Sequence, residues 1–220
     1  MLTLLEEVVL LTIDPKTGGL RGGSEFSVRY GLVGAVLFDL ALARRIDTDV
    51  ETIAVIDPTP TGHAIQDDLL ARLANGRAPL NIRQCVEDLF LQSQDLERHV
   101  LDQLQSRGII RHQTDKLLWV IDRHRFPLVD GTPQRLVTVR VAQAILEDTI
   151  PETRDIMLVS LAAACGLLGV VLAEGQIEAR ADWIRTLSGI ESISRNVGTA
   201  IASLVADLAG GLGMGAGIMA

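Results

Sequence analysis

The side chains best suited to chemistry are basic residues that crowd between positions 111 and 125. Arginine and lysine bind phosphate and other anions, and histidine gains or loses a proton near neutral pH. The same residue types also cover solvated hairpins that bind nothing. An anion site and a plain solvated surface are therefore both open. The set is Arg111, His112, Lys116, Arg123, His124 and Arg125.

No pattern in the chain predicts an enzyme. The glycine-rich run 18–23 lacks the GK[ST] ending and the preceding strand of a phosphate-binding loop. His63, Asp67 and Asp68 share a helical face, but no second cluster completes a metal shell. Helix-start charge balance explains these acids. We predict no catalytic residue, no metal and no cofactor.

The elements that must position these residues are mainly helices. Ser24 or Ser27 can cap the second helix, whose glycines Gly31 and Gly34 indicate close approach of another backbone or tight core packing. Apolar residues at helical spacing predict helices over residues 2–11, 30–46, 64–74, 82–106, 133–149, 152–173, 178–187 and 190–208. The first of these is expected to be amphipathic, with Glu6 and Glu7 on its polar side.

Two β-hairpins interrupt the helices. Runs 109–112 and 117–121, joined by a polar turn at 113–116, predict one of them, and residues 41–57 repeat the pattern of helix end, strand, turn and strand. The fold class is thus mainly α, a single helical domain with a central buried apolar helix, surrounding amphipathic helices and one or two β-hairpins. We place the domain at residues 1–209, followed by a flexible glycine-rich tail at 210–220.

One apolar stretch, residues 156–173, is long enough to invite comparison with a membrane span. Its 18 residues carry no charge, yet as a helix they would reach only about 27 Å. We interpret the stretch as the buried central helix. Cys85 and Cys165 lie far apart in sequence in apolar surroundings, and we predict that both are buried free thiols of a cytoplasmic protein.

Composition limits the function classes. The formal net charge is −8, and 48% of the residues are hydrophobic, so the chain folds around a large core and has no general attraction to nucleic acid. A helix leading into a basic hairpin is typical of winged-helix DNA-binding domains. However, the helix before this hairpin carries Glu87, Asp88, Asp95, Glu97 and Asp102, which would repel DNA.

The N-terminal third resembles the Golgi phosphoprotein 3 family. The resemblance rests on a leucine-rich opening helix with paired glutamates, a GLxGxxLxxLALxxRI-type helix and a Pro-Thr-Gly step before the next helix. The chain matches these with Glu6 and Glu7, with residues 31–46, and with Pro60, Thr61 and Gly62. The resemblance implies a non-enzymatic adaptor that binds phosphatidylinositol 4-phosphate at the cytoplasmic face of a membrane.

In that family a tryptophan and three arginines hold the lipid headgroup. Here the tryptophan position falls near Ser24 or Glu25, and the arginine positions fall on Val33, Gln94 and Glu97. A valine and a glutamate remove phosphate ligands and add repulsion. Arg21, Arg29 and Arg98 lie nearby and are candidate substitutes. We therefore expect weak binding to anionic lipids with little preference for the 4-phosphate.

The family also uses its hairpin for self-assembly. The matching residues here are 113–124, including Gln113, Lys116, Leu118, Trp119 and His124. A strand at 117–121 would be apolar on both faces, so a partner chain or the segment 126–129 would have to cover it. We predict an anionic-lipid-binding peripheral adaptor; the alternative is a winged-helix-like or protein-binding module without lipid affinity.

Overall fold

The computed structural model describes residues 1–49, 51–76, 80–91, 93–117, 121–190, 196–197, 199–201 and 203. It is mainly α-helical, as the sequence predicts. In chain order the elements are α1 (Leu4–Thr12), α2 (Glu25–Leu42), β1 (Ile46–Thr48), β2 (Thr52–Val55), α3 (Ala64–Asn75), β3 (Leu80–Asn81), α4 (Ile82–Phe90), α5 (Ser93–Ser106), β4 (Gln113–Leu117), β5 (Ile121–Arg125), α6 (Thr132–Leu146), α7 (Thr153–Ala164), α8 (Leu168–Val171), α9 (Glu174–Ala179) and α10 (Ala181–Ile190).

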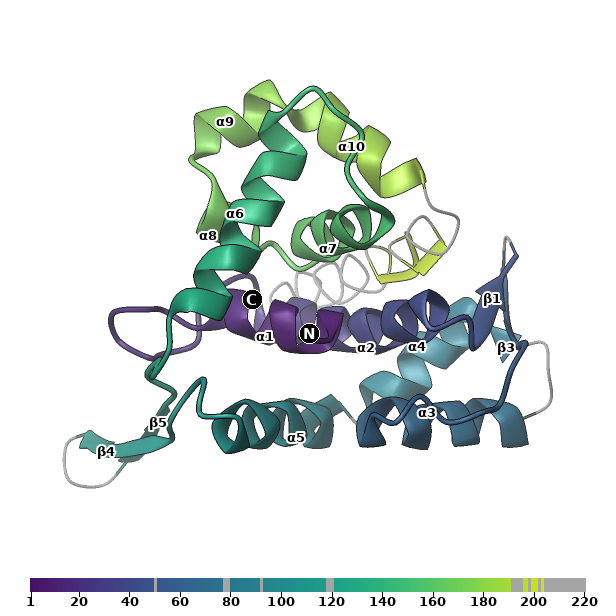
Figure 1. The fold of residues 1–220 in the computed structure, drawn as a ribbon, viewed down its shortest axis with the longest axis horizontal. Helices are drawn as coiled ribbons and strands as arrows, with labels where there is room; N and C mark the ends of the chain where they lie inside the picture. Colours follow the sequence, from purple (N-terminus) through teal and green to yellow (C-terminus); the bar gives the residue numbers. More distant parts are fainter. Residues whose placement is uncertain are drawn as a thin grey trace, which may run out of the picture.

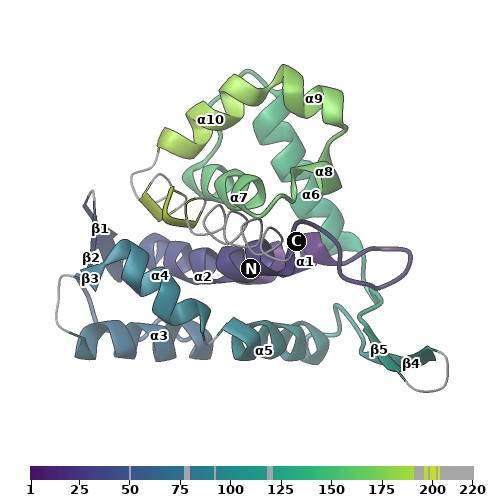
Figure 2. The ribbon, with the colours of Figure 1, turned by 180° about the vertical axis from the view of Figure 1, so that it is seen from behind.

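The helices form layers on either side of α1 and α2. Figures 1 and 2 show α1 and α2 running through the middle, with α3 and α5 on one side and α6, α7, α9 and α10 on the other. The strands β1, β2 and β3 lie at one end of the molecule and the β4–β5 hairpin projects at the other. The two middle helices therefore form much of the core that both outer layers cover.

Helix α1 is buried on every side, which corrects the expectation of an amphipathic helix. All nine of its residues are buried, including Glu6 and Glu7. The apolar pattern of the segment did not reveal this, because two adjacent glutamates normally mark a solvent face. Burial of both acids is possible because arginines from three other segments reach them.

The glutamates of α1 form ion pairs across the layers. Arg107, just after α5, donates to Glu6 Oε1 at 2.6 Å. Glu7 is paired with Arg140 of α6 at 2.7 Å and with Arg154 of α7 at 3.1 Å. Because an unpaired buried carboxylate is costly, these pairs fix the positions of α5, α6 and α7 relative to α1.

A carboxylate from α2 caps the N-terminus of α1. The amide of Leu4 donates to Asp39 Oδ1 at 2.9 Å and the amide of Leu5 donates to Oδ2 at 3.2 Å. These amides have no partner within their own helix, so the contact stabilises α1. Burial nevertheless raises the pKa of Asp39 to about 6, although the two amide donors act in the opposite direction.

Ser24, one of the two predicted caps, begins helix α2, because its Oγ accepts a hydrogen bond from the amide of Ser27. The helix therefore runs from Glu25 to Leu42, earlier at both ends than the predicted 30–46. Its glycines face side chains rather than another backbone, so tight core packing is the correct reading. A Cβ atom on Gly31 would lie 1.9 Å from Cys165 Sγ, and one on Gly34 would lie 2.7 Å from Ile201 Cδ1. Cys85 and Cys165 are buried free thiols, as expected.

The predicted central helix is buried but shorter than expected. Helix α7 ends at Ala164, and Gly166 adopts a left-handed φ of 67° before α8 begins. Glycine tolerates that conformation, so the turn divides the apolar stretch 156–173. In the described part of the chain, no helix combines the length and the apolar character needed to cross a membrane. The predicted continuation of 152–173 as one helix is therefore wrong.

The single helix predicted over residues 82–106 is also divided. Helix α4 ends at Phe90 and α5 starts at Ser93. Ser93 Oγ donates to the Phe90 carbonyl at 2.6 Å and accepts from Arg29 Nε at 2.8 Å. The break is thus stabilised by an arginine of α2, a contact that periodicity within residues 82–106 cannot reveal.

Both predicted hairpins are present, but the second is shifted. Strands β1 and β2 pair antiparallel, and β3 adds a third strand that the sequence analysis missed. In the second hairpin β4 pairs with β5, from Gln113 opposite Arg125 to Leu117 opposite Ile121. The predicted turn at 113–116 is therefore strand. Residues 118–120, and with them Leu118 and Trp119, lie outside the described residues.

The C-terminal helix is described only in part. Asn196, Val197, residues 199–201 and Ser203 are helical, and Val197 and Ile201 are fully buried. Packing of this segment on the domain is confirmed for those two residues. The remainder of the predicted helix and the tail at 210–220 fall outside the described ranges.

The pKa of Asp39 predicts a pH-dependent difference in stability between the wild type and an Asp39→Asn variant. Between about pH 4 and pH 6 the unfolded state is ionised at this residue while the folded state keeps its proton, so stability falls as pH rises through that window. We expect the free energy of unfolding of the wild type, relative to Asp39→Asn, to fall by about 2 kcal/mol from pH 4.5 to pH 7. Urea unfolding of both proteins at each pH measures this difference in the free energy of unfolding. A pH-independent difference would refute the raised pKa.

The contact between Gly31 and Cys165 predicts that Gly31→Ala destabilises the fold by about 1–3 kcal/mol through overpacking. Adding Cys165→Ala should recover much of that loss, because it removes the sulfur that the new methyl group meets. Gly189→Ala is the control, since nothing lies within 4 Å of its added Cβ. Thermal unfolding of the wild type, Gly31→Ala, Cys165→Ala, the double variant and Gly189→Ala measures the effect. Equal losses for Gly31→Ala in the wild-type and Cys165→Ala backgrounds would contradict it.

Candidate functional site

A shallow depression of about 250 Å³ lies where the ends of three elements meet. It is formed by the end of α1, the loop that follows it, the first turns of α2 and one residue of α5. Two arginines and two glutamates line it. The lining residues are Thr12, Leu20, Arg21, Gly22, Gly23, Glu25, Val28, Arg29 and Glu97. We call this depression the α2 pocket.

Arg21 is held in the α2 pocket by its backbone. Its amide donates to the Thr12 carbonyl at 2.6 Å, and the adjacent bridge between Ile13 and Leu20 closes the loop. Its guanidinium lies 3.7 Å from Asp14, a distance that allows only a weak ion pair. Arg21 Nε is buried and has no hydrogen-bond partner among the described residues. The charge of Arg21 is therefore only weakly compensated by its protein neighbours.

Arg29 belongs to the wall of the α2 pocket and to the packing beneath it. Its Nε donates to Ser93 Oγ and its Nη2 donates to the Phe90 carbonyl at 3.1 Å. Its guanidinium carbon lies 4.3 Å from the centroid of the Phe90 ring. Arg29 therefore contributes positive charge to the pocket from a fixed position.

The acidic side chains oppose anion binding in the same pocket. Burial raises the pKa of Glu97, the nearby Glu25 raises it further, and Arg29 acts in the opposite direction. Glu25 and Arg29 are four residues apart on α2, which puts them on one helix face. With two guanidinium groups and two carboxyl groups in its lining, the pocket has no net charge when all four are ionised.

The four residues that match the family's lipid site do not lie in one pocket. Glu97 lines the α2 pocket and Ser24 caps α2 beside it. Val33 is only 1% exposed and lines a different cavity. Gln94 lies in α5, but its side chain is outside the described part.

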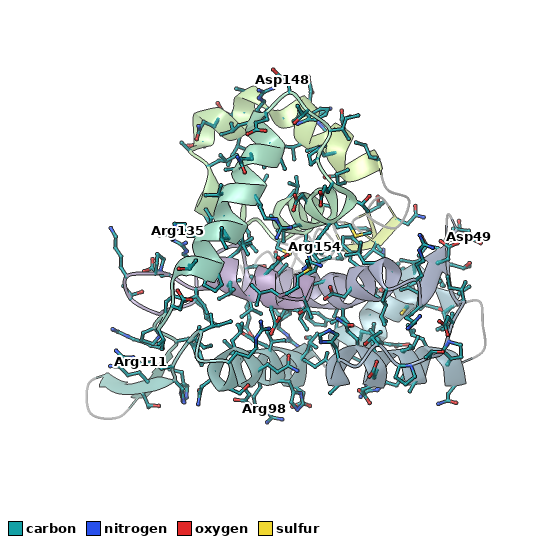
Figure 3. All side chains as sticks on the ribbon, in the orientation of Figure 1. Asp49, Arg98, Arg111, Arg135, Asp148 and Arg154 are labelled. Atoms are coloured by element: carbon teal, nitrogen blue, oxygen red, sulfur yellow. The ribbon has the colours of Figure 1, made fainter. Side chains whose placement is uncertain are left out.

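The candidate substitutes also separate. Arg21 and Arg29 meet in the α2 pocket, whereas Arg98 does not line it. Figure 3 shows Arg98 extending from α5 away from the rest of the molecule. It forms an exposed pair with Asp95 at 3.0 Å. The sequence could have shown that Arg98 lies outside the pocket. Arg98 directly follows Glu97 in a helix, so its side chain points about 100° away from that of Glu97.

A larger, mainly apolar cavity of about 460 Å³ lies between α2, α3, α4 and α5. Val33 and Val36 contribute to it from α2, and acidic and basic residues, including Asp68, Arg72 and Asp95, line it as well. Asp68 and Arg72 pair with each other at 2.5 Å. The sequence gives no sign of this cavity, because its lining comes from four helices.

The basic residues of the hairpin gather on β4, β5 and the residues beside them. Gln113 is opposite Arg125, and Lys116 is opposite Asp122. Backbone bonds fix the base of the hairpin: the Arg111 amide donates to the Pro127 carbonyl at 3.0 Å and the Phe126 amide donates to the Gly18 carbonyl at 2.6 Å. Residues 126–128 therefore lie against the segment before β4 and the glycine-rich loop.

Of His63, Asp67 and Asp68, only Asp67 bonds through its side chain to the residues just before α3, and Asp68 pairs with Arg72 instead. Asp67 accepts hydrogen bonds from the amide and hydroxyl of Thr61 and from the amide of Gly62. Among the described residues, no group of three or more histidine, cysteine, aspartate or glutamate side chains is placed to hold a metal ion.

Comparisons with known proteins find similarity over most of the chain. The family model described as Golgi phosphoprotein 3 (GPP34) matches residues 4–208. Vacuolar protein sorting-associated protein 74 of Eremothecium gossypii is 28% identical over 214 residues, with 81% of this chain and 64% of the relative covered. The chain thus spans about 64% of the length of that curated relative.

Proposed function

The chain belongs to the Golgi phosphoprotein 3 family, and from that premise we propose that it is a non-enzymatic adaptor that attaches to membranes by binding anionic lipid headgroups. The family model matches residues 4–208, which is nearly the whole chain. The observation that supports lipid binding is the meeting of Arg21 and Arg29 in the α2 pocket, where Arg21 is paired only weakly, 3.7 Å from Asp14.

The surroundings of the α2 pocket favour attachment to an anionic surface. The glycine-rich loop that carries Arg21 contacts the base of the basic hairpin through Gly18 and Phe126. Lys16, Arg21, Arg111 and Arg125 therefore belong to neighbouring segments at one end of a chain whose net charge is −8. A local basic end on an acidic protein orients it toward an anionic membrane.

The same pocket argues for weak binding with little selectivity. Glu25 and Glu97 oppose a phosphate, and Val33 lies in the separate apolar cavity, where it offers no phosphate ligand. We therefore propose that the protein binds anionic lipids generally, with little preference for phosphatidylinositol 4-phosphate. Self-association through residues 113–124 is a second part of the proposal.

Vesicle flotation tests the lipid specificity. We expect the protein to float with vesicles containing phosphatidylserine or any phosphoinositide at low salt, and to be released as salt is raised, because screening weakens exposed charge pairs. Strong selectivity for the 4-phosphate would show that the pocket retains a specific headgroup site. Retention on duplex DNA with no flotation would favour the nucleic-acid alternative.

Substitutions in the α2 pocket test whether it is the site. Arg21→Gln should lower vesicle affinity about fivefold, since one basic residue near an anionic surface contributes about 1 kcal/mol. Arg98→Gln is the matched control, because it removes the same charge from an exposed residue outside the pocket. Equal losses in both variants would mean that only overall charge matters.

The raised pKa of Glu97 predicts how acid affects binding. As pH falls through that pKa, Glu97 gains a proton and stops repelling phosphate, so binding by the wild type should strengthen. Glu97→Gln should bind more strongly than the wild type at neutral pH and should lose much of this pH dependence. Flotation across the range from neutral to mildly acidic pH measures it, and weaker binding by Glu97→Gln would contradict the proposed role.

Deletion of residues 113–124 tests self-association. The backbone bonds at Arg111, Phe126 and Leu128 remain to close the shortened loop. We expect a lower mass by light scattering, with helical content by circular dichroism nearly unchanged. The same monomer mass before and after the deletion would end this part of the proposal.

A further inference from the structure

Two of the four histidines of the chain meet beside the hairpin. His112 precedes β4 and His124 lies in β5, and His112 Nε2 is 2.9 Å from His124 Nδ1. The ring centroids are 5.1 Å apart, with an angle of 25° between the planes. Both residues are exposed.

The positions of the two rings are fixed by the structure around them. His112 also stacks against Phe126, with the ring centroids 5.3 Å apart. The register of the strands, with Thr114 opposite His124, places His112, His124 and Phe126 on one face of the hairpin. The bonds from Arg111 to Pro127 and from Phe126 to Gly18 hold the base of the hairpin in place.

The contact between the rings requires that at least one imidazole be neutral. One nitrogen carries a proton and donates, while the other accepts through its lone pair. When both imidazoles are neutral, the donor ring can carry its proton on its other nitrogen instead, which leaves both facing nitrogens with free lone pairs. That is the arrangement in which two histidines bind a transition metal.

We propose that His112 and His124 form a two-histidine site for a divalent transition metal such as Zn²⁺, Ni²⁺ or Cu²⁺. The metal takes the place of the shared proton, which moves through solvent to the other nitrogen of the donor ring; a pair that carries one extra proton releases that proton to solvent. Imidazole nitrogen suits these ions, whereas Mg²⁺ and Ca²⁺ prefer oxygen ligands. The inference rests on the hairpin alone and does not depend on lipid binding.

The distance between the nitrogens suits the metal after a small adjustment. Two Zn–N bonds of about 2.0–2.1 Å at a tetrahedral angle place the nitrogens about 3.3 Å apart. Exposed rings can separate by the few tenths of an ångström that this requires. Among the described residues, no group of three or more histidine, cysteine, aspartate or glutamate side chains surrounds the pair, so the site is proposed with these two protein ligands.

The positive charges near the two histidines weaken the binding of a metal cation. Arg111 precedes His112 and Arg125 follows His124, and their positive charges oppose a cation. Because both ligands are imidazole nitrogens, affinity should follow the general order of divalent metals for nitrogen ligands, with Cu²⁺ bound most tightly. It should also be weaker than at a structural zinc site with four protein ligands.

Calorimetric titration of the full, untagged chain with Zn²⁺ at about pH 7.5 tests the site, with Mg²⁺ as the negative control. We expect one Zn²⁺ per chain. His112→Gln and His124→Gln should each lower the affinity by at least about tenfold, the smallest loss expected even for an outer partner of a metal ligand. His63→Gln and His99→Gln are matched controls, because they remove the other two histidines, both exposed, and should bind as the wild type does.

Two further measurements make the outcome decisive. The paramagnetic resonance spectrum of the Cu²⁺ complex should show two nitrogen ligands. Circular dichroism checks that each variant is folded. The proposal is overturned if His112→Gln and His124→Gln bind Zn²⁺ like the wild type, if the two control variants lose as much affinity, or if the Cu²⁺ spectrum shows oxygen ligands alone.

Discussion

Burial of two adjacent glutamates in α1 is the constraint on which the rest of the structure depends. A carboxylate removed from water must be paired, and removal of one partner of such a pair typically costs about 3–5 kcal/mol. Glu6 and Glu7 obtain their partners from Arg107, Arg140 and Arg154, which come from both outer layers. The layers are therefore held in place by charge as well as by apolar packing, and α1 cannot shift without leaving a buried acid unpaired.

The position of the α2 pocket follows from that arrangement. The C-terminal end of α1 is held by Gln134 of α6, whose Nε2 lies 2.6 Å from the Leu10 and Ile13 carbonyls. The chain then turns, and the Arg21 amide bonds to the last residue of α1. Arg29 is held from the other side by the Ser93 and Phe90 contacts at the start of α5. Both arginines are thus placed by helix ends, and neither depends on the other for its position.

The sequence predicted the helical class and both hairpins because these depend on local patterns. It failed where a distant residue decides the outcome. The break between α4 and α5 depends on Arg29, and the burial of Glu6 and Glu7 depends on arginines about 100 residues away or more. The shift in the second hairpin has a different cause. Alternation locates a strand when one face is buried, but this hairpin projects from the body, so residues such as Asp115 and Arg123 pair as readily as apolar ones.

Helical geometry explains why the site residues could be placed only in part. Arg29 and Val33 are four residues apart on α2, so both lie on the same side of that helix, one turn from each other. That single turn separates the two cavities: Arg29 lines the α2 pocket, and Val33 lines the apolar one. An anion that binds this protein can therefore meet the positive charge of Arg29, one helical turn before Val33 on α2. Arg21 lies in the same pocket. An arginine at position 29 in place of one at position 33 keeps the helix and its packing intact, but it changes the side chains that surround the ligand. In this pocket those side chains include Glu25 and Glu97.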